Sequence, residues 1–268
     1  MKRKPAVAGY FYPQQEESLK SVVSRMIDFE CEKRKAISVI VPHAGFEYSG
    51  PVAGAVFSSV QLPKIFVILG PNHRQVKSRF AIMKEGTWQT PFGEVPIDSG
   101  LANAIATRSD LITDDSDAHE REHSLEVQLP FIQYFRHDFS IVPISIAYQT
   151  SYEELEELGH ALAESIQNRD EDVLIVASTD MSHYVSQEEA EIKDSLAIEE
   201  IKRLDAQGLY DVVSRENISM CGYQPTTATI VASKDLGATQ AELIKYQTSG
   251  EVTKNFHEVV GYAGMRIF

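Results

Sequence analysis

Three apolar runs in the chain stop abruptly, and each is followed within a few residues by a histidine. The runs and their histidines are Val39–Val41 with His43, Ile65–Leu69 with His73, and Val173–Ala177 with His183. Uninterrupted apolar runs of this length are typical of strands buried on both faces of a parallel sheet. The first two runs end at proline or glycine, residues that break a central strand. The pattern therefore predicts an open α/β sheet with polar residues beyond the ends of its strands.

Ligands of open α/β sheets bind beyond the carboxyl ends of the strands, where short loops bring backbones close together. A single histidine in such a place is usually an ordinary loop residue. The same placement after three strands favours a convergent histidine cluster instead. Gly45 and Gly50, which follow His43, would let the backbone approach a ligand closely.

Size and composition narrow the class of protein. The 268 residues suffice for one large core, and we predict a single α/β domain over residues 1–268. Its central sheet should be mixed but mostly parallel, with helices on its flanks. A formal net charge of -14 argues against nucleic-acid binding, because phosphate contacts need clustered lysine and arginine. No apolar stretch approaches the ~20 residues of a membrane helix, so we expect a cytoplasmic protein.

Side chains near the strand ends are candidate metal ligands. His43 and His73 are the imidazoles expected to bind a metal ion. The choices for a third ligand are Cys221, Asp180 and Glu122. Two histidines with a carboxylate suit non-haem Fe(II), whereas two histidines with a thiolate also suit zinc or copper.

Two further histidines are candidates for proton transfer. His183 lies three residues after Asp180 and is the predicted general acid or base, with Asp180 holding its ring. His123 is the second candidate, because Glu122–Glu126 precedes an apolar helical pattern and should form the N-terminus of that helix. The helix dipole would keep His123 neutral. A capping arrangement without chemistry explains the same residues equally well.

Two segments remain open to different interpretations. Cys221 precedes a helical pattern, where a thiol pKa can be lowered, so it could be the nucleophile of a cysteine hydrolase with His183 or His123 as base. Composition alone favours the other interpretation, a small buried apolar residue. The aromatic segment Ala8–Pro13 could be a packing plug or one wall of a pocket.

Several short motifs become specific when their order and spacing are taken together. They are Ala8-Gly9 with aromatic residues, Pro42-His43-Ala44-Gly45 with Tyr48-Ser49-Gly50, Leu69-Gly70-Pro71-Asn72-His73, Glu122-His123-Ser124-Leu125-Glu126 with Leu129-Pro130, Ser178-Thr179-Asp180 with His183, and Cys221-Gly222 with Pro225. This combination resembles the MEMO family over nearly the whole chain. The resemblance implies the fold of the class III extradiol ring-cleaving dioxygenases (LigB-like). It places His43, His73 and Cys221 at the family's metal-binding positions, with Asp180 and His183 in the same cleft.

The chain departs from the related patterns at two positions. Cys221 stands where the ring-cleaving enzymes use a glutamate, and a thiolate would change the charge and redox behaviour of iron. Arg74 stands where a second histidine often follows in MEMO relatives, and its guanidinium could bind an anionic substrate group. Tyr48 and Glu122 complete the predicted substrate contacts.

The function predicted from these residues is metal-dependent, dioxygenase-like redox chemistry on a small molecule in the cleft. Iron is the favoured metal, with copper and zinc as alternatives. The first alternative function is a non-catalytic module that recognises a short peptide or protein through the same cleft. The second is the cysteine hydrolase. We expect neither nucleic acid nor membrane as a partner, and the chain could act alone or as a homo-oligomer.

Overall fold

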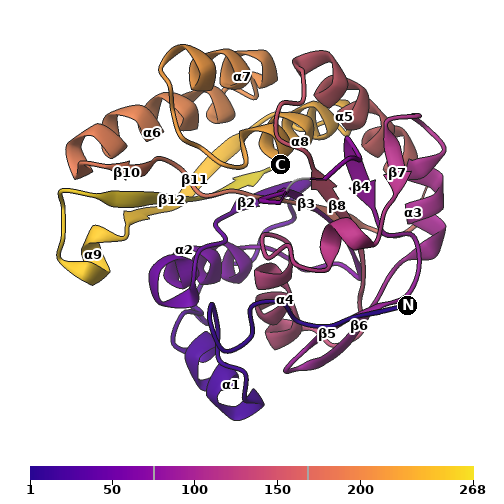
Figure 1. Ribbon diagram of the computed structural model, residues 1–268, viewed down its shortest axis with the longest axis horizontal. Coiled ribbons are helices and arrows are strands. Elements are labelled where there is room, and N and C mark those ends of the chain that lie inside the picture. The colour runs from indigo at the N-terminus through magenta and orange to yellow at the C-terminus, as the bar shows by residue number, and fades with distance from the viewer. Residues whose placement is uncertain (75, 168) are drawn as a thin grey trace.

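The predicted strands form the centre of a nine-stranded mixed sheet in the computed structural model, which describes residues 1–74, 76–167 and 169–268. Figure 1 shows this sheet running through the middle of the molecule. In sheet order its strands are β10 (His183–Val185), β12 (Val259–Ile267), β2 (Ser38–Val41), β9 (Val173–Ser178), β3 (Ile65–Pro71), β8 (Ser140–Ile146), β4 (Phe80–Ile82) and β7 (Ile112–Asp114), and β11 (Ala241–Thr248) pairs with β12.

The centre of the sheet is parallel, and its register aligns the strand ends. Strand β9 pairs in parallel with both β2 and β3, so that Val41 lies opposite Ser178 and Leu69 opposite Ala177. The three runs are almost completely buried, which explains why they lack polar alternation. The carboxyl ends of β2, β9 and β3 therefore meet at one edge, and the predicted α/β sheet is confirmed.

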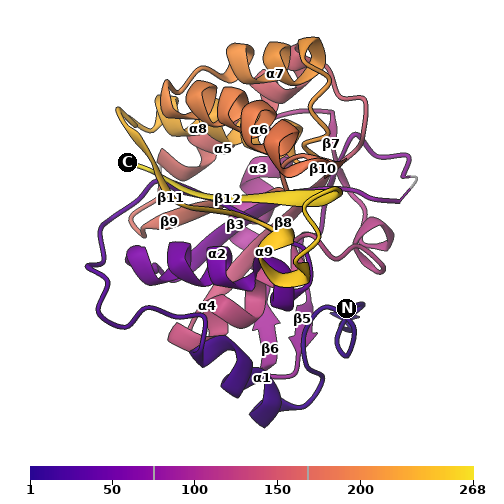
Figure 2. The same cartoon turned by 90° about the vertical axis from the view of Figure 1, so that its left-hand side faces the viewer.

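Helices cover both faces of the sheet and make three layers (Figures 1 and 2). One face carries α3 (Ser99–Ala106), α5 (Tyr152–Gln167), α6 (Gln187–Lys202), α7 (Ala206–Arg215) and α8 (Tyr223–Asp235). The other carries α1 (Glu16–Ser24), α2 (Phe46–Ser59) and α4 (Leu129–Phe135). The short elements are α9 (Gly250–Thr253) and the 3₁₀ turns η1 (Asp117–His119) and η2 (Glu126–Gln128).

A second, three-stranded sheet ties the N-terminus to the rest of the molecule. Strands β5 (Thr87–Thr90) and β6 (Gly93–Pro96) form an antiparallel hairpin. Strand β1 (Lys2–Arg3) pairs in parallel with β5. Trp88 of β5 is fully buried, and the guanidinium of Arg3 lies 4.1 Å from its ring centroid.

One local expectation is wrong. The helix expected to open at Glu122–Glu126 begins only at Leu129, after the 3₁₀ turn η2. The N-cap of α3 is Asp98, whose carboxylate accepts a hydrogen bond from the amide of Leu101. Pro143 lies in β8, which is an internal strand. The carbonyl of Pro143 accepts a hydrogen bond from the amide of Met83, just past the end of β4. The nitrogen of Pro143 faces the same way, so the N–H that proline lacks would lie beyond the paired residues of β4.

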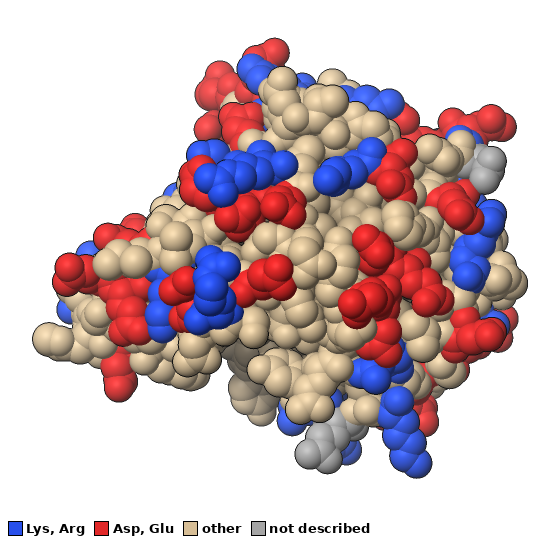
Figure 3. Space-filling model, turned by 90° about the horizontal axis from the view of Figure 1, so that it is seen from above, with Lys and Arg blue, Asp and Glu red and all other residues tan. Residues whose placement is uncertain are grey.

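Charged side chains of both signs are intermingled on the surface. On the face seen in Figure 3, acidic side chains alternate with basic ones, and the described residues there form no continuous basic surface. Within the described ranges, no helix combines the length and the apolar character that crossing a bilayer demands.

Candidate metal site

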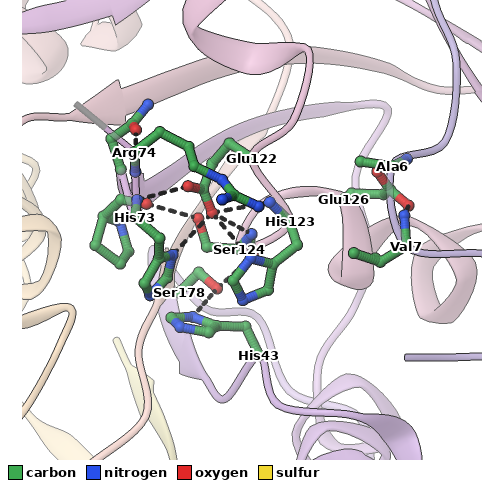
Figure 4. A network of polar contacts seen from close by, with 12 residues as sticks. Ala6, Val7, His43, His73, Arg74, Glu122, His123, Ser124, Glu126 and Ser178 are labelled. Carbon is green, nitrogen blue, oxygen red and sulfur yellow. Dashed lines mark hydrogen bonds and ion pairs between the residues drawn. The ribbon is translucent and has the colours of Figure 1, made fainter. Parts of the chain in front are cut away.

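Three histidines converge beyond the carboxyl ends of the central strands. His43 follows β2, His73 follows β3, and His123 lies in the turn before η2. Each of them offers a nitrogen atom within 4.8 Å of those of the other two. The rings of His73 and His123 stack at 4.5 Å, and that of His43 meets them edge-on at 5.2 and 5.5 Å (Figure 4). The group could hold a metal ion. The predicted convergence is observed for His43 and His73, but the third member is His123 and not His183, the histidine predicted after β9.

The hydrogen bonds around His43 determine which of its ring nitrogens is protonated. The Ser178 hydroxyl donates its only proton to the carbonyl of Ser124 at 2.6 Å. It must therefore accept from both the Gln128 amide at 2.9 Å and His43 Nδ1 at 3.0 Å. Neutral His43 thus carries its proton on Nδ1 and presents the lone pair of Nε2. Burial, followed by the neighbouring histidines, holds the pKa of His43 well below its usual value.

Glu122 determines which ring nitrogen of His73 is protonated. Its buried carboxylate accepts from His73 Nδ1 at 2.9 Å and from the His73 amide at 2.6 Å. The amides of His123 and Ser124 donate to it as well, each at 2.8 Å. Burial alone would raise the pKa of Glu122, but its hydrogen bonds and its electrostatic interactions with His73 and His123 keep the pKa well below the usual range. An ionised Glu122 accepts only, so His73 also presents Nε2.

His123 is the third histidine of the group and is held in a neutral state. Burial is the largest cause that lowers its pKa to about 4, while the Glu122 carboxylate opposes this change. The neutral state predicted for His123 is therefore supported, but burial replaces the expected helix dipole as its cause. Arg74 lies close enough to contribute a small electrostatic lowering, and its side chain is directed toward His123 (Figure 4).

Cys221 adjoins the group through His43. Its Sγ lies 3.2 Å from His43 Nε2 and accepts a hydrogen bond from the Asp180 amide at 3.3 Å. Burial and the nearby Asp180 carboxylate raise the pKa of the Cys221 thiol, so the metal-free protein holds a thiol that donates to His43. A bound cation would favour the thiolate, because metal binding displaces thiol protons.

Asp180 and His183 are both close to the group but do not bind each other as expected. Asp180 Oδ1 accepts from the amides of His43 at 2.7 Å and Ala44 at 3.3 Å, and this fixes the loop after β2. Burial raises the pKa of Asp180. His183 Nδ1 donates instead to the carbonyl of Ser219 at 2.9 Å. The imidazole of His183 therefore keeps Nε2 as its proton-accepting atom.

Two glycines allow the loops to close around this group. A Cβ on Gly70 would lie 2.6 Å from Ser124 Oγ, and one on Gly222 would lie 2.4 Å from the carbonyl oxygen of Ser178. Both separations are far below van der Waals contact. Gly70 thus lets the segment that carries His123 approach β3, and Gly222 lets Cys221 approach β9.

Replacing Gly222 with alanine should displace Cys221 from His43. Because the obstructing atom belongs to the backbone, we expect a loss of about 1–3 kcal/mol in the free energy of unfolding and weaker metal binding. Chemical denaturation and metal titration of Gly222→Ala measure both effects. Gly237→Ala is the control for helix-end glycines, since its added Cβ meets no atom within 4 Å and only its positive φ is strained. Equal metal affinity in the two variants would contradict the close-approach argument.

A surface hollow of about 510 Å³ meets the histidine group at Arg74. It is lined by Arg74, Val76, Lys77, Asp115, Asp117, Ala118, Glu120 and Arg121, so it shares no histidine with the group. The hollow is highly charged, because its lining combines three cations with three carboxylates. Tyr48, in the first turn of α2, is half-buried. The substrate contacts of Arg74, Tyr48 and Glu122 stay predictions.

His119, at the end of η1, should make stability depend on pH. Burial lowers its pKa to about 4, with Arg3 as the second cause. The unfolded chain takes up a proton near pH 6.5 but the folded chain only near pH 4, so stability should fall as the pH drops through this window. Replacing His119 with glutamine should remove part of that fall, measured by denaturation between pH 7 and 4. An unchanged pH profile would contradict the buried neutral state.

Comparisons with known proteins agree with the sequence motifs. The family model described as Memo-like protein matches residues 3–266 of the chain. A MEMO1 family protein of Methanothermobacter thermautotrophicus is 42% identical over 275 residues, which cover 98% of this chain and 99% of the relative. One from Aquifex aeolicus is 42% identical over 265 residues, covering 98% of each chain.

A solved structure shares the fold at low sequence identity. An uncharacterized protein from Escherichia coli K12 superposes with a TM-score of 0.61 and 14% identity, covering 87% of this chain and 100% of its own. This similarity supports the architecture alone.

Proposed function

Because the chain belongs to the Memo-like protein family, we propose that it is a metal-binding redox enzyme whose metal is held by His43 and His73. Cys221 and His123 are the candidates for the remaining protein ligands. The observation that carries the proposal is the orientation of the rings: Ser178 and Glu122 each bind an Nδ1, so that Nε2 carries the lone pair on both rings. Metal-binding histidines are commonly oriented in this way by a carboxylate or another acceptor.

The donor set fits a transition metal. Imidazoles suit iron, copper and zinc alike, and a thiolate adds affinity for softer ions. Burial keeps His43 and His123 unprotonated, which is the state that a metal requires. When bound, iron or copper would supply one-electron chemistry and dioxygen activation, and iron is our first choice. Asp180 supports the same region by fixing the loop of His43.

The chain's own side chains would act on the substrate. His183 is the proposed general base, since the Ser219 carbonyl holds its Nδ1 and leaves Nε2 as acceptor. Arg74 would bind an anionic group, because it lies beside His123 and opens onto the charged hollow. We therefore propose a small anionic substrate, such as a phenol that carries a carboxylate.

A cysteine hydrolase is a second candidate, favoured by the contact of 3.2 Å between Cys221 and His43. Its mechanism requires a thiolate beside a protonated imidazole. Burial raises the pKa of Cys221 and lowers that of His43, and both changes oppose this ion pair. A bound cation would stabilise the thiolate and the neutral imidazole together, so the metal site is the better explanation.

Oxygen uptake tests the redox proposal. The protein is reconstituted anaerobically with Fe(II) and mixed with oxygen and a panel of phenolic carboxylates. We expect substrate-dependent oxygen consumption that is lost in His43→Ala and reduced in His183→Gln. Arg74→Gln should raise KM for anionic phenols but not for their neutral analogues. Absence of uptake with every substrate, in protein shown to carry metal, would favour the non-catalytic binding module.

A further inference from the structure

The N-terminal strap, which we define as residues Arg3–Tyr12, reaches the histidine group from below the sheet. Its first residue is unusual because Arg3 is only 4% exposed, although it carries a charge. The guanidinium forms an ion pair with Glu126 at 2.7 Å. It also donates to the carbonyls of His119, at 2.7 Å, and Glu122. Buried charges persist only with such complete pairing, so Arg3 joins the beginning, middle and end of the segment 119–126.

Glu126 receives all of its partners from the strap. Its carboxylate is completely buried, and it accepts from Arg3 and from the amides of Ala6 at 2.7 Å and Val7 at 3.2 Å. The Tyr12 hydroxyl donates to it at 2.6 Å. Figure 4 shows the two amides closing on Glu126 beside the histidine group. The two ends of the strap are thus fastened to a single side chain that follows His123 by three positions.

The strap also contacts the loops that carry the histidines. The ring of Phe11 lies 4.7 Å from the ring of His123. His123 belongs to the segment 119–126, to which Arg3 is bound. The carbonyl of Phe11 accepts a hydrogen bond of 2.8 Å from the amide of Phe46, three residues after His43. The strap therefore links the loop of His43 to the turn of His123.

We propose that the strap is a positioning element for His123, acting through Arg3 and Glu126. Arg3 fixes the backbone of Glu122, whose carboxylate in turn holds His73 and the amide of His123. Phe11 limits the movement of the His123 ring. The contribution of His123 to metal binding would then depend on a residue 119 positions before Glu122 in the chain. This inference rests on the proposed metal site.

Arg266 provides a matched control for Arg3. It is 3% exposed, donates to the carbonyl of Ser59 at 2.8 Å, and forms an ion pair with Glu242 at 2.6 Å. Its guanidinium also lies over an aromatic ring, that of Phe268, at 5.4 Å. Arg3→Met and Arg266→Met therefore remove the same chemistry from buried sites, but only the first touches the histidine segment.

The test measures Zn²⁺ affinity by chelator competition and amide hydrogen exchange of the metal-free variants. We expect Arg3→Met to weaken zinc binding at least ~10-fold and to speed exchange at His123 and Ser124. Arg266→Met should change neither. Equal effects of the two variants would overturn the proposal. Tyr12→Phe, which removes one donor to Glu126, should show the same trend at smaller size and serves if Arg3→Met does not fold.

A double-mutant cycle with His123→Ala tests the route of the effect. If Arg3 acts through His123, Arg3→Met should weaken zinc binding less in His123→Ala than in the wild type. The remaining effect would pass from Glu122 to His73. Fully additive losses would mean that Arg3 affects the metal independently of His123, and the proposal would fail. Wild-type protein that binds no zinc would refute the proposed metal site instead. The exchange comparison at His123 and Ser124 would then still decide whether the strap positions this segment.

Discussion

Replacing Glu126 with glutamine should lower the free energy of unfolding by about 3–5 kcal/mol, because it leaves the charge of Arg3 buried without its partner. The carboxylate is completely buried and satisfies four donors, two of them backbone amides. A glutamine has the same shape but turns an N–H₂ group toward these donors. Urea denaturation at neutral pH measures the loss.

The control for this prediction is the exposed ion pair between Lys2 and Glu94. These side chains are 49% and 47% exposed, and an ion pair so open to solvent contributes little to stability. Glu94→Gln should therefore leave the stability nearly unchanged. A loss in Glu126→Gln no larger than that in Glu94→Gln would contradict the view that the strap is held by a buried charge network.

Replacing Glu122 with glutamine should weaken metal binding by about 10–100-fold while leaving the fold intact. The carboxylate orients His73 through Nδ1 and also binds the amides of His73, His123 and Ser124. Glutamine retains one acceptor oxygen, so part of this arrangement survives. Its NH₂ group can no longer accept from His73, and the ring is free to turn.

Metal titration by isothermal calorimetry measures the affinity of Glu122→Gln. The exposed Glu85 provides a control for simple loss of negative charge, since Glu85→Gln should bind metal as the wild type does. Equal affinity in the two variants would mean that Glu122 does not support a ligand, and its predicted role as a substrate contact would remain the alternative.

The sheet and the first two histidines could be predicted from local sequence alone. Val39–Val41 and Ile65–Leu69 are apolar on every residue, which is the pattern of a strand buried on both faces, and a break after each leaves a histidine at the sheet edge. The common edge follows from parallel pairing with β9. Local sequence therefore predicts a strand end before each histidine, whereas their convergence depends on the long-range pairing with β9.

The supporting residues could not be predicted in the same way. Arg3 lies in a basic N-terminal run that resembles an exposed tail, and its pairing with Glu126 spans 123 positions. Ser178 and Gln128 determine which nitrogen of His43 is protonated, and no sequence pattern indicates this role for either of them. His123 was placed at a helix N-terminus because a 3₁₀ turn and a helix share nearly the same spacing of apolar residues.

The metal content of the protein tests the central claim most directly. Wild type, His43→Ala, His73→Ala, His123→Ala and Cys221→Ser would be purified without oxygen, reconstituted with Fe(II), and measured by mass spectrometry of bound metals. We predict near-stoichiometric iron in the wild type and its loss in His43→Ala and His73→Ala. The other two variants identify which of Cys221 and His123 completes the site. A wild-type protein that retains no metal after reconstitution with Fe(II), Cu(I) or Zn(II) would contradict the account.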